Sequence, residues 1–104
     1  MKKTLLLAGI FSFLLVVNAG AEEYRSYDGR VQAFTTDDSS FVKGAVYDRN
    51  SRTLAVQIDN GRSEGHTYVY HNVPQYEYDS LKNANSKGGY FNNSVRGSYT
   101  YDRY

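Results

Sequence analysis

A basic segment near the end of the chain carries residue types that bind acidic groups. Its polar and aromatic side chains are two, four and three positions apart: Tyr90, Asn92, Arg96 and Tyr99. On a helix, positions three and four apart share a face, so Asn92, Arg96 and Tyr99 are expected to lie near one another. An arginine pairs with a carboxylate or phosphate through two parallel hydrogen bonds, and a phenol ring offers a stacking surface. We therefore predict a ligand-binding site here, with Lys87 as a further cation.

Two alternatives to this site stay open. In the first, Asn92 and Arg96 only cap the helix and pin it to the rest of the domain. In the second, the polar loop of residues 60–66 binds the partner through Arg62, Glu64 and His66. Such a loop could plug a cell-envelope enzyme, so an inhibitor or immunity-type protein is the alternative function.

The residue sets that enzymes use are missing from the sequence. Cysteine is absent, and the only histidines, His66 and His71, are five positions apart instead of the four that place two zinc ligands on one helix face. The acidic pairs at residues 22–23 and 37–38 are adjacent, whereas general acid–base catalysis needs two carboxylates in separate environments. We predict no enzyme activity, no cofactor and no metal site.

The first residues predict export. Lys2 and Lys3 precede a largely apolar run at residues 5–17, and small residues follow at positions 19–21. This is the order of a secretory signal peptide, and the run is shorter than the roughly 20 residues that span a membrane. We predict cleavage after Ala21, with Ala19 as a second candidate, and an exported bacterial protein, periplasmic or secreted. No membrane span is then expected.

Export and charge together indicate the kind of partner. Once Lys2 and Lys3 are removed, ten basic residues face eleven acidic ones, without the basic excess of nucleic-acid modules. A protein or an envelope component is therefore the expected partner. Nucleic acid is a residual third candidate, and the sequence does not indicate an oligomeric state.

Hydrophobic patterning predicts three strands. Residues 22–35 are polar and are predicted to be an N-terminal arm, with at most a short strand at 30–35. Strand-forming residues at 41–47 and strict alternation at 52–59 flank a polar turn, which is typical of a hairpin. Residues 67–71 predict a third strand.

Helices are predicted to follow the strands. Pro74 suits the first position of a helix that ends at Gly88 and Gly89, and a second short helix can begin there. The predicted fold is α+β: a small three- to four-stranded antiparallel sheet, made of the hairpin plus the third strand, packed by one or two C-terminal helices. Residues 36–104 form this domain.

An ordered set of motifs runs through the predicted domain. Its positions are Ser39-Ser40, Val46-Tyr47-Asp48, Thr53-Leu54, Tyr68-Val69-Tyr70, Val73-Pro74, Tyr78, Leu81, Ala84, Ser86, Gly88, Tyr90-Phe91-Asn92, Val95-Arg96 and Tyr99. This set resembles the KTSC domain, a small family named for its occurrence at the C-terminus of some lysyl-tRNA synthetases. The resemblance covers about residues 36–101 and implies the fold, without an activity to transfer. The chain departs from the family in its longer loop at residues 60–66 and in its predicted export.

Overall fold

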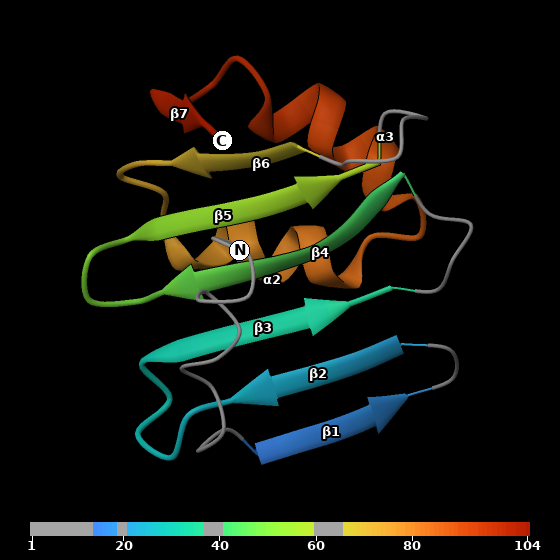
Figure 1. Cartoon of the computed structure of the whole chain (residues 1–104), viewed down its shortest axis with the longest axis vertical. Helices are drawn as coiled ribbons and strands as arrows, with labels where there is room; N and C mark the ends of the chain where they lie inside the picture. The colour runs from blue at the N-terminus through green and yellow to red at the C-terminus, as the bar shows by residue number, and fades with distance from the viewer. Residues whose placement is uncertain (1–13, 19–20, 37–40, 60–65) are drawn as a thin grey trace.

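The fold is a single antiparallel sheet with helices on one face. The computed structural model describes residues 14–18, 21–36, 41–59 and 66–104. Seven strands lie in the sheet in the order in which they occur in the chain (Figure 1). They are β1 (Leu14–Asn18), β2 (Ala21–Arg25), β3 (Val31–Thr35), β4 (Val42–Asp48), β5 (Thr53–Ile58), β6 (His66–Tyr70) and β7 (Tyr101–Arg103).

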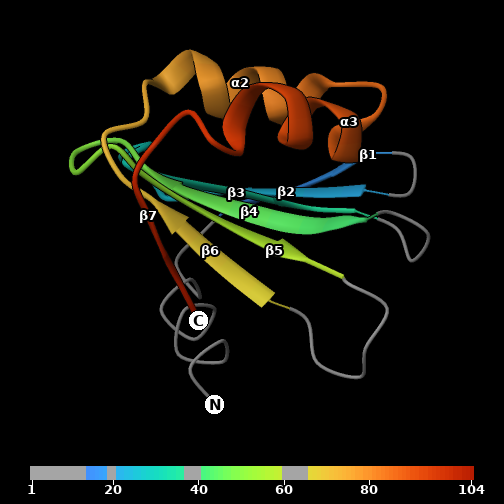
Figure 2. The ribbon, with the colours of Figure 1, turned by 90° about the horizontal axis from the view of Figure 1, so that it is seen from above.

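The helical layer follows β6 and covers one face of the sheet (Figure 2). It consists of α2 (Gln75–Asn83), α3 (Lys87–Tyr90) and the π-helical turn η1 (Phe91–Val95). The Ser86 hydroxyl accepts a hydrogen bond from the Gly89 amide at 3.1 Å and so caps α3. No helix within the described ranges is long and apolar enough to cross a membrane.

The predicted α+β class is confirmed, but the predicted sheet of three to four strands is wrong. The hairpin and the third strand are present as β4, β5 and β6. The short strand predicted at 30–35 is present as β3, but residues 22–35 are not a loose arm, because β2 and β3 both join the sheet; β7 adds a strand at the other end. β2 and β7 carry many polar side chains and show no apolar alternation, whereas β3 also buries Ala33 and Phe34.

The core lies between the helices and the sheet, and tyrosine rings make up much of it. Tyr47, Tyr70 and Tyr78 are fully buried. Tyr47 stacks on Tyr78 of α2 with 5.6 Å between ring centroids. Its hydroxyl donates to the Val73 carbonyl at 2.6 Å, just before Pro74 begins the helix. Tyrosine therefore supplies apolar area and, through its hydroxyl, also holds the sheet to the start of α2.

Candidate functional site

A buried carboxylate joins the two helical segments. Glu77 lies on α2 and is only 4% exposed. Its Oε2 accepts a hydrogen bond from the Tyr90 hydroxyl at 2.7 Å, and its Oε1 accepts one from the Tyr99 hydroxyl at 2.7 Å. Burial, followed by the hydrogen bond to Glu77, raises the pKa of both tyrosines. Tyr90 and Tyr99, predicted as ligand-binding residues, thus hold the end of the helical layer against α2.

Glu77 is not among the site residues predicted from the sequence. An acidic residue in the first turn of a helix is common because it complements the helix dipole, so its position alone indicates no further role. The two hydroxyl donors come from positions 13 and 22 residues further along the chain. No local spacing rule connects residues so far apart.

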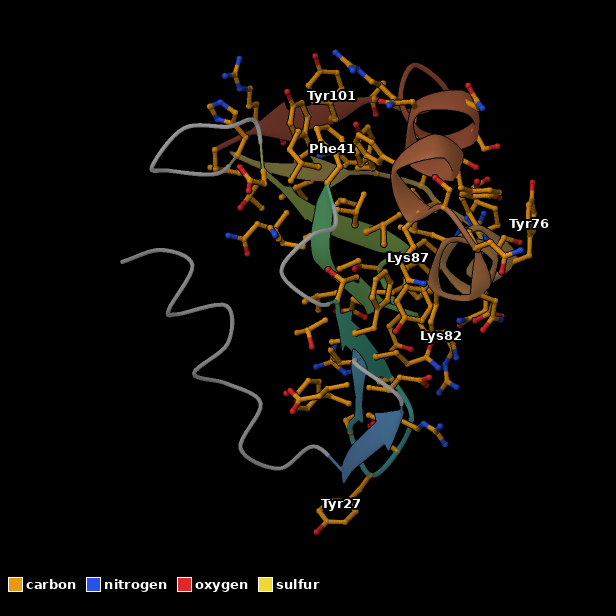
Figure 3. The ribbon with its side chains drawn as sticks, turned by 90° about the vertical axis from the view of Figure 1, so that its right-hand side faces the viewer. Tyr27, Phe41, Tyr76, Lys82, Lys87 and Tyr101 are labelled. Atoms are coloured by element: carbon orange, nitrogen blue, oxygen red, sulfur yellow. The ribbon has the colours of Figure 1, made fainter. Side chains whose placement is uncertain are left out.

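Lys87 also has a partner within the domain. Its Nζ donates to the Ala84 carbonyl at 3.1 Å and lies 5.8 Å from the centroid of the Phe34 ring. In Figure 3 the Lys87 side chain lies between the helical layer and the sheet. The structure therefore places Lys87 apart from Asn92 and Arg96, as a contact between α3 and the core.

Asn92 and Arg96 do lie together, as the spacing predicted. Arg96 Nη1 donates to Asn92 Oδ1 at 3.3 Å, and both side chains are exposed. No carboxylate lies within ion-pair distance of the Arg96 guanidinium among the residues described. Burial raises the pKa of the Tyr70 hydroxyl, and the positive charge of Arg96 lowers it by a smaller effect. The guanidinium can still form a bidentate pair with an added anion.

An aromatic cluster lies beside this pair, between β6, β7 and η1. Tyr101 contacts Tyr68 and Tyr70, with 5.4 Å between ring centroids in each case. Both of these rings meet Phe91 edge-on, and Phe91 lies 6.4 Å from Phe41. Tyr101 is 51% exposed. Figure 3 shows Tyr101 and Phe41 at the same end of the molecule.

Tyr70 is unusual within this cluster. Its side chain has 0% exposure, and its hydroxyl has no hydrogen-bond partner within the part of the chain that the structure describes. Burial raises the pKa of Tyr70 to about 12. An unpaired buried hydroxyl costs roughly 1–3 kcal/mol, so this position is destabilising in the isolated domain.

Arg103 completes the exposed part of the cluster. Its guanidinium lies 6.0 Å from the centroid of Tyr68, and its Nη2 is 3.0 Å from His66 Nε2. No acidic residue pairs with it among the described ranges. We call the exposed region formed by Tyr68, Tyr101 and Arg103 the β7 surface.

The predicted partner loop is only partly described. Arg62 and Glu64 lie outside the described residues. His66 is the first residue of β6, and its ring contacts Arg103, so this end of the loop adjoins the β7 surface. Among residues 14–18, 21–36, 41–59 and 66–104, no three His, Asp or Glu side chains are grouped so as to hold a metal ion.

The fold and this surface define a class of small α+β domain: one antiparallel sheet, helices on one face and an aromatic cluster at one edge. Residues 38–99 match the KTSC domain, and the chain belongs to the KTSC domain family. The predicted resemblance is confirmed. The match includes β4 to η1 but ends before β7, so two main residues of the β7 surface, Tyr101 and Arg103, lie beyond it.

Known relatives include both larger and similarly small proteins. The chain is 33% identical over 66 residues to a lysine–tRNA ligase of Trichormus variabilis and 30% identical over 66 residues to one of Nostoc punctiforme. In each case the aligned region covers 64% of this chain and only 11% of the ligase's length. A crystal structure of a KTSC domain protein from Yersinia pestis is also similar, with a TM-score of 0.59 and 27% identity. That match covers 71% of this chain and 97% of the Yersinia protein.

Proposed function

We propose that this protein is a small exported binding module without catalytic activity, and that it binds its ligand at the β7 surface. One observation carries the proposal. Tyr101 stays half exposed although its ring lies against Tyr68 and Tyr70, and Arg103 beside it lacks an acidic partner among the described residues. Tyrosine and arginine are enriched among the residues that dominate binding energy at interfaces.

The chemistry of this surface favours a ligand with an acidic group next to an apolar or planar one. Arg103 can pair with a carboxylate or phosphate, and Tyr101 offers an adjacent aromatic face. A protein or an envelope component of this kind is the proposed ligand.

A non-enzymatic role is supported by the hydrogen bonds of the buried Glu77 carboxylate. Glu77 accepts hydrogen bonds from two tyrosine hydroxyls that belong to the same domain. Its carboxylate therefore fits a structural role better than that of a general base poised to take a proton from a substrate.

Export is supported by the charged, apolar and small-residue order of the first 21 residues. Cleavage after Ala21 would remove β1 and leave β2 as an edge strand with Glu22, Glu23 and Arg25. Charged residues are a common means of preventing unwanted pairing at such an edge. Two measurements on the natural protein test the proposal. Mass spectrometry identifies its N-terminal residue, which should be Glu22, and cell fractionation shows whether the protein is exported. An unprocessed cytosolic protein would refute the proposal.

The binding proposal is tested by comparing captured components between variants. The processed protein is immobilised and exposed to envelope extract, in parallel with Tyr101→Ala and Arg103→Ala. Tyr27→Ala is the matched control, because Tyr27 is 79% exposed and lies at the opposite end of the molecule from Tyr101 (Figure 3). We expect one component to be retained by the wild type and the control but lost by both test variants. Capture that is equal in all four proteins would refute the β7 surface.

An inhibitor of an envelope enzyme is the second candidate for this module. It is favoured by one contact, between His66 at the end of the predicted partner loop and Arg103. The same capture experiment tests the inhibitor hypothesis. It predicts that the captured component is an enzyme and that its activity falls when the purified protein is added. Retention on nucleic acid that weakens steeply with salt would instead support the residual candidate.

A further inference from the structure

The outer edge of β7 carries backbone groups that pair with no other strand among the described residues, and their arrangement follows from the pairing with β6. Tyr104 and Thr67 exchange two backbone hydrogen bonds, of 2.8 and 3.2 Å, and the His71 amide donates to the Thr100 carbonyl at 3.0 Å. In an antiparallel ladder, such hydrogen-bonded pairs alternate with pairs that exchange none. Tyr101 and Arg103 belong to the second kind, opposite Tyr70 and Tyr68. Their N–H and C=O groups therefore point away from β6.

No further strand follows β7 within the described sheet, where it is the last in the order (Figure 1). The edge therefore offers two donors and two acceptors, from Tyr101 and Arg103, at the spacing that an added strand requires. The side chains of the same two residues lie on the helical face, where Tyr101 contacts Tyr70 and Arg103 contacts Tyr68. A peptide strand added here would place alternate side chains against this ring and this guanidinium.

We propose that the β7 edge binds an extended acidic peptide segment by strand addition. This inference rests on the proposed function and specifies how the partner engages the β7 surface. Charge complementarity selects the ligand, because Arg103 lacks an acidic partner among the described residues. A carboxylate opposite Arg103 would supply a charge-assisted hydrogen bond.

A second copy of this chain fits the edge less well. Two copies of β7 could pair antiparallel in different registers. In the register centred on Asp102, the two Asp102 side chains are directly opposed. In the register centred on Arg103, the two arginines are directly opposed. Directly opposed like charges destabilise a strand pair. The register about Tyr101 requires Arg103 to pair with Tyr99, which lies outside the strand and is bound to Glu77.

The opposite interpretation is that β7 is a protected edge. Very short strands and charged side chains are means by which proteins prevent edge pairing, and β7 has only three residues. The two interpretations differ in what they predict for an acidic peptide. Strand addition requires binding through the peptide backbone, whereas a protected edge predicts none.

The first experiment uses a fluorescent synthetic peptide in which valine and glutamate alternate. There are two control peptides. The first carries lysine in place of every glutamate. The second keeps the acidic sequence but has N-methyl groups on those backbone amides that would donate to β7. We expect the processed protein to bind the acidic peptide, to bind the lysine peptide at least about tenfold more weakly, and to lose roughly tenfold in affinity for the N-methylated one. Anisotropy titration measures all three affinities.

Amide hydrogen exchange by NMR locates the binding edge. The Tyr101 and Arg103 amides should exchange roughly tenfold more slowly with peptide bound, because they gain acceptors. The Asp102 amide should change little, since the pairing pattern directs it toward β6. Slowing at Asp102 alone, or at none of the three, would overturn strand addition.

Substitutions at Arg103 separate the backbone from the charge. Arg103→Ala removes the guanidinium, and Arg103→Pro also removes the outward N–H while leaving the ladder to β6 intact. We expect the proline variant to bind the acidic peptide several-fold more weakly than the alanine variant, with Arg30→Ala unchanged as the control. Equal binding by the alanine and proline variants, equal binding of acidic and lysine peptides, or no peptide binding would overturn the inference. The proposed function would still stand if Tyr101-dependent capture from envelope extract is observed, and both fall if that capture also fails.

Discussion

The network of Glu77, Tyr90 and Tyr99 provides the sharpest test of how this domain is held together. Removing one hydroxyl, in Tyr90→Phe or Tyr99→Phe, deletes a 2.7 Å hydrogen bond to a buried carboxylate. Hydrogen bonds to charged groups contribute about 1.5–3 kcal/mol each, so each variant should lose stability in that range. For a small domain whose unfolding free energy is roughly 5–10 kcal/mol, that loss is easily measured.

The double variant is more informative than either single one. Glu77 is 4% exposed, so with both hydroxyls removed its carboxylate is buried without either tyrosine donor. A buried charge without a partner destabilises the fold by more than the sum of the two single losses. We expect a coupling of about 1 kcal/mol or more between Tyr90→Phe and Tyr99→Phe. Adding Glu77→Leu to the double variant should recover part of the loss, because the uncompensated charge is then removed.

Urea unfolding followed by circular dichroism measures these free energies. Tyr27→Phe is the control, because its ring is largely exposed, and it should change stability by no more than about 0.5 kcal/mol. Losses below that level in both single variants, or strict additivity in the double variant, would refute the view that Glu77 organises the helical layer.

Three further predictions concern the core. Burial raises the pKa of Tyr70 to about 12, so ionisation of its hydroxyl opposes folding: the pH has no effect through this group below pH ~10, and stability is lost progressively from there to about 12. Tyr70→Phe should raise the free energy of unfolding in urea at pH 7 by about 1 kcal/mol and reduce the alkaline loss. Gly44→Ala should destabilise the sheet by about 1–3 kcal/mol in the same assay, because an added Cβ would lie 2.7 Å from the Phe34 carbonyl oxygen. Tyr47→Phe removes the 2.6 Å bond to the Val73 carbonyl and should cost roughly 1–2 kcal/mol by thermal unfolding.

Each of these predictions has a result that contradicts it. A Tyr70→Phe variant that is less stable at neutral pH would mean that the hydroxyl has a favourable partner. Unchanged stability in Gly44→Ala would show that β3 and β4 can separate slightly at that point. If Tyr47→Phe unfolds at the wild-type temperature, the bond to Val73 does not hold α2 to the sheet.

The sequence predicted the central part of the fold better than its edges. Strict alternation at residues 52–59 predicted β5, because a half-buried strand directs every second side chain into the core. Pro74 predicted the start of the helical layer to within one residue: it is the extended N-cap before Gln75 and not the first helical residue. Neither rule could detect β2, whose Glu22, Glu23 and Arg25 show no apolar alternation.

The candidate site was predicted only in part. The four-residue spacing of Asn92 and Arg96 correctly predicted their contact, because neighbours on a helix are determined locally. Tyr90 and Tyr99 were assigned to a ligand, but they bind Glu77 instead. Tyr101 and Arg103, which dominate the β7 surface, carried no local signal that separated them from an unstructured tail.

The sequence by itself determined the family, the central strands and the helical layer, because each follows from a pattern within a few neighbouring residues. Only the tertiary structure decided which polar segments become edge strands and which distant hydroxyls share the Glu77 carboxylate. The physical reason is that an edge strand forms through backbone hydrogen bonds to a partner strand, which do not require an alternating apolar pattern. A buried polar group likewise takes its partners from whatever the packed elements bring within reach.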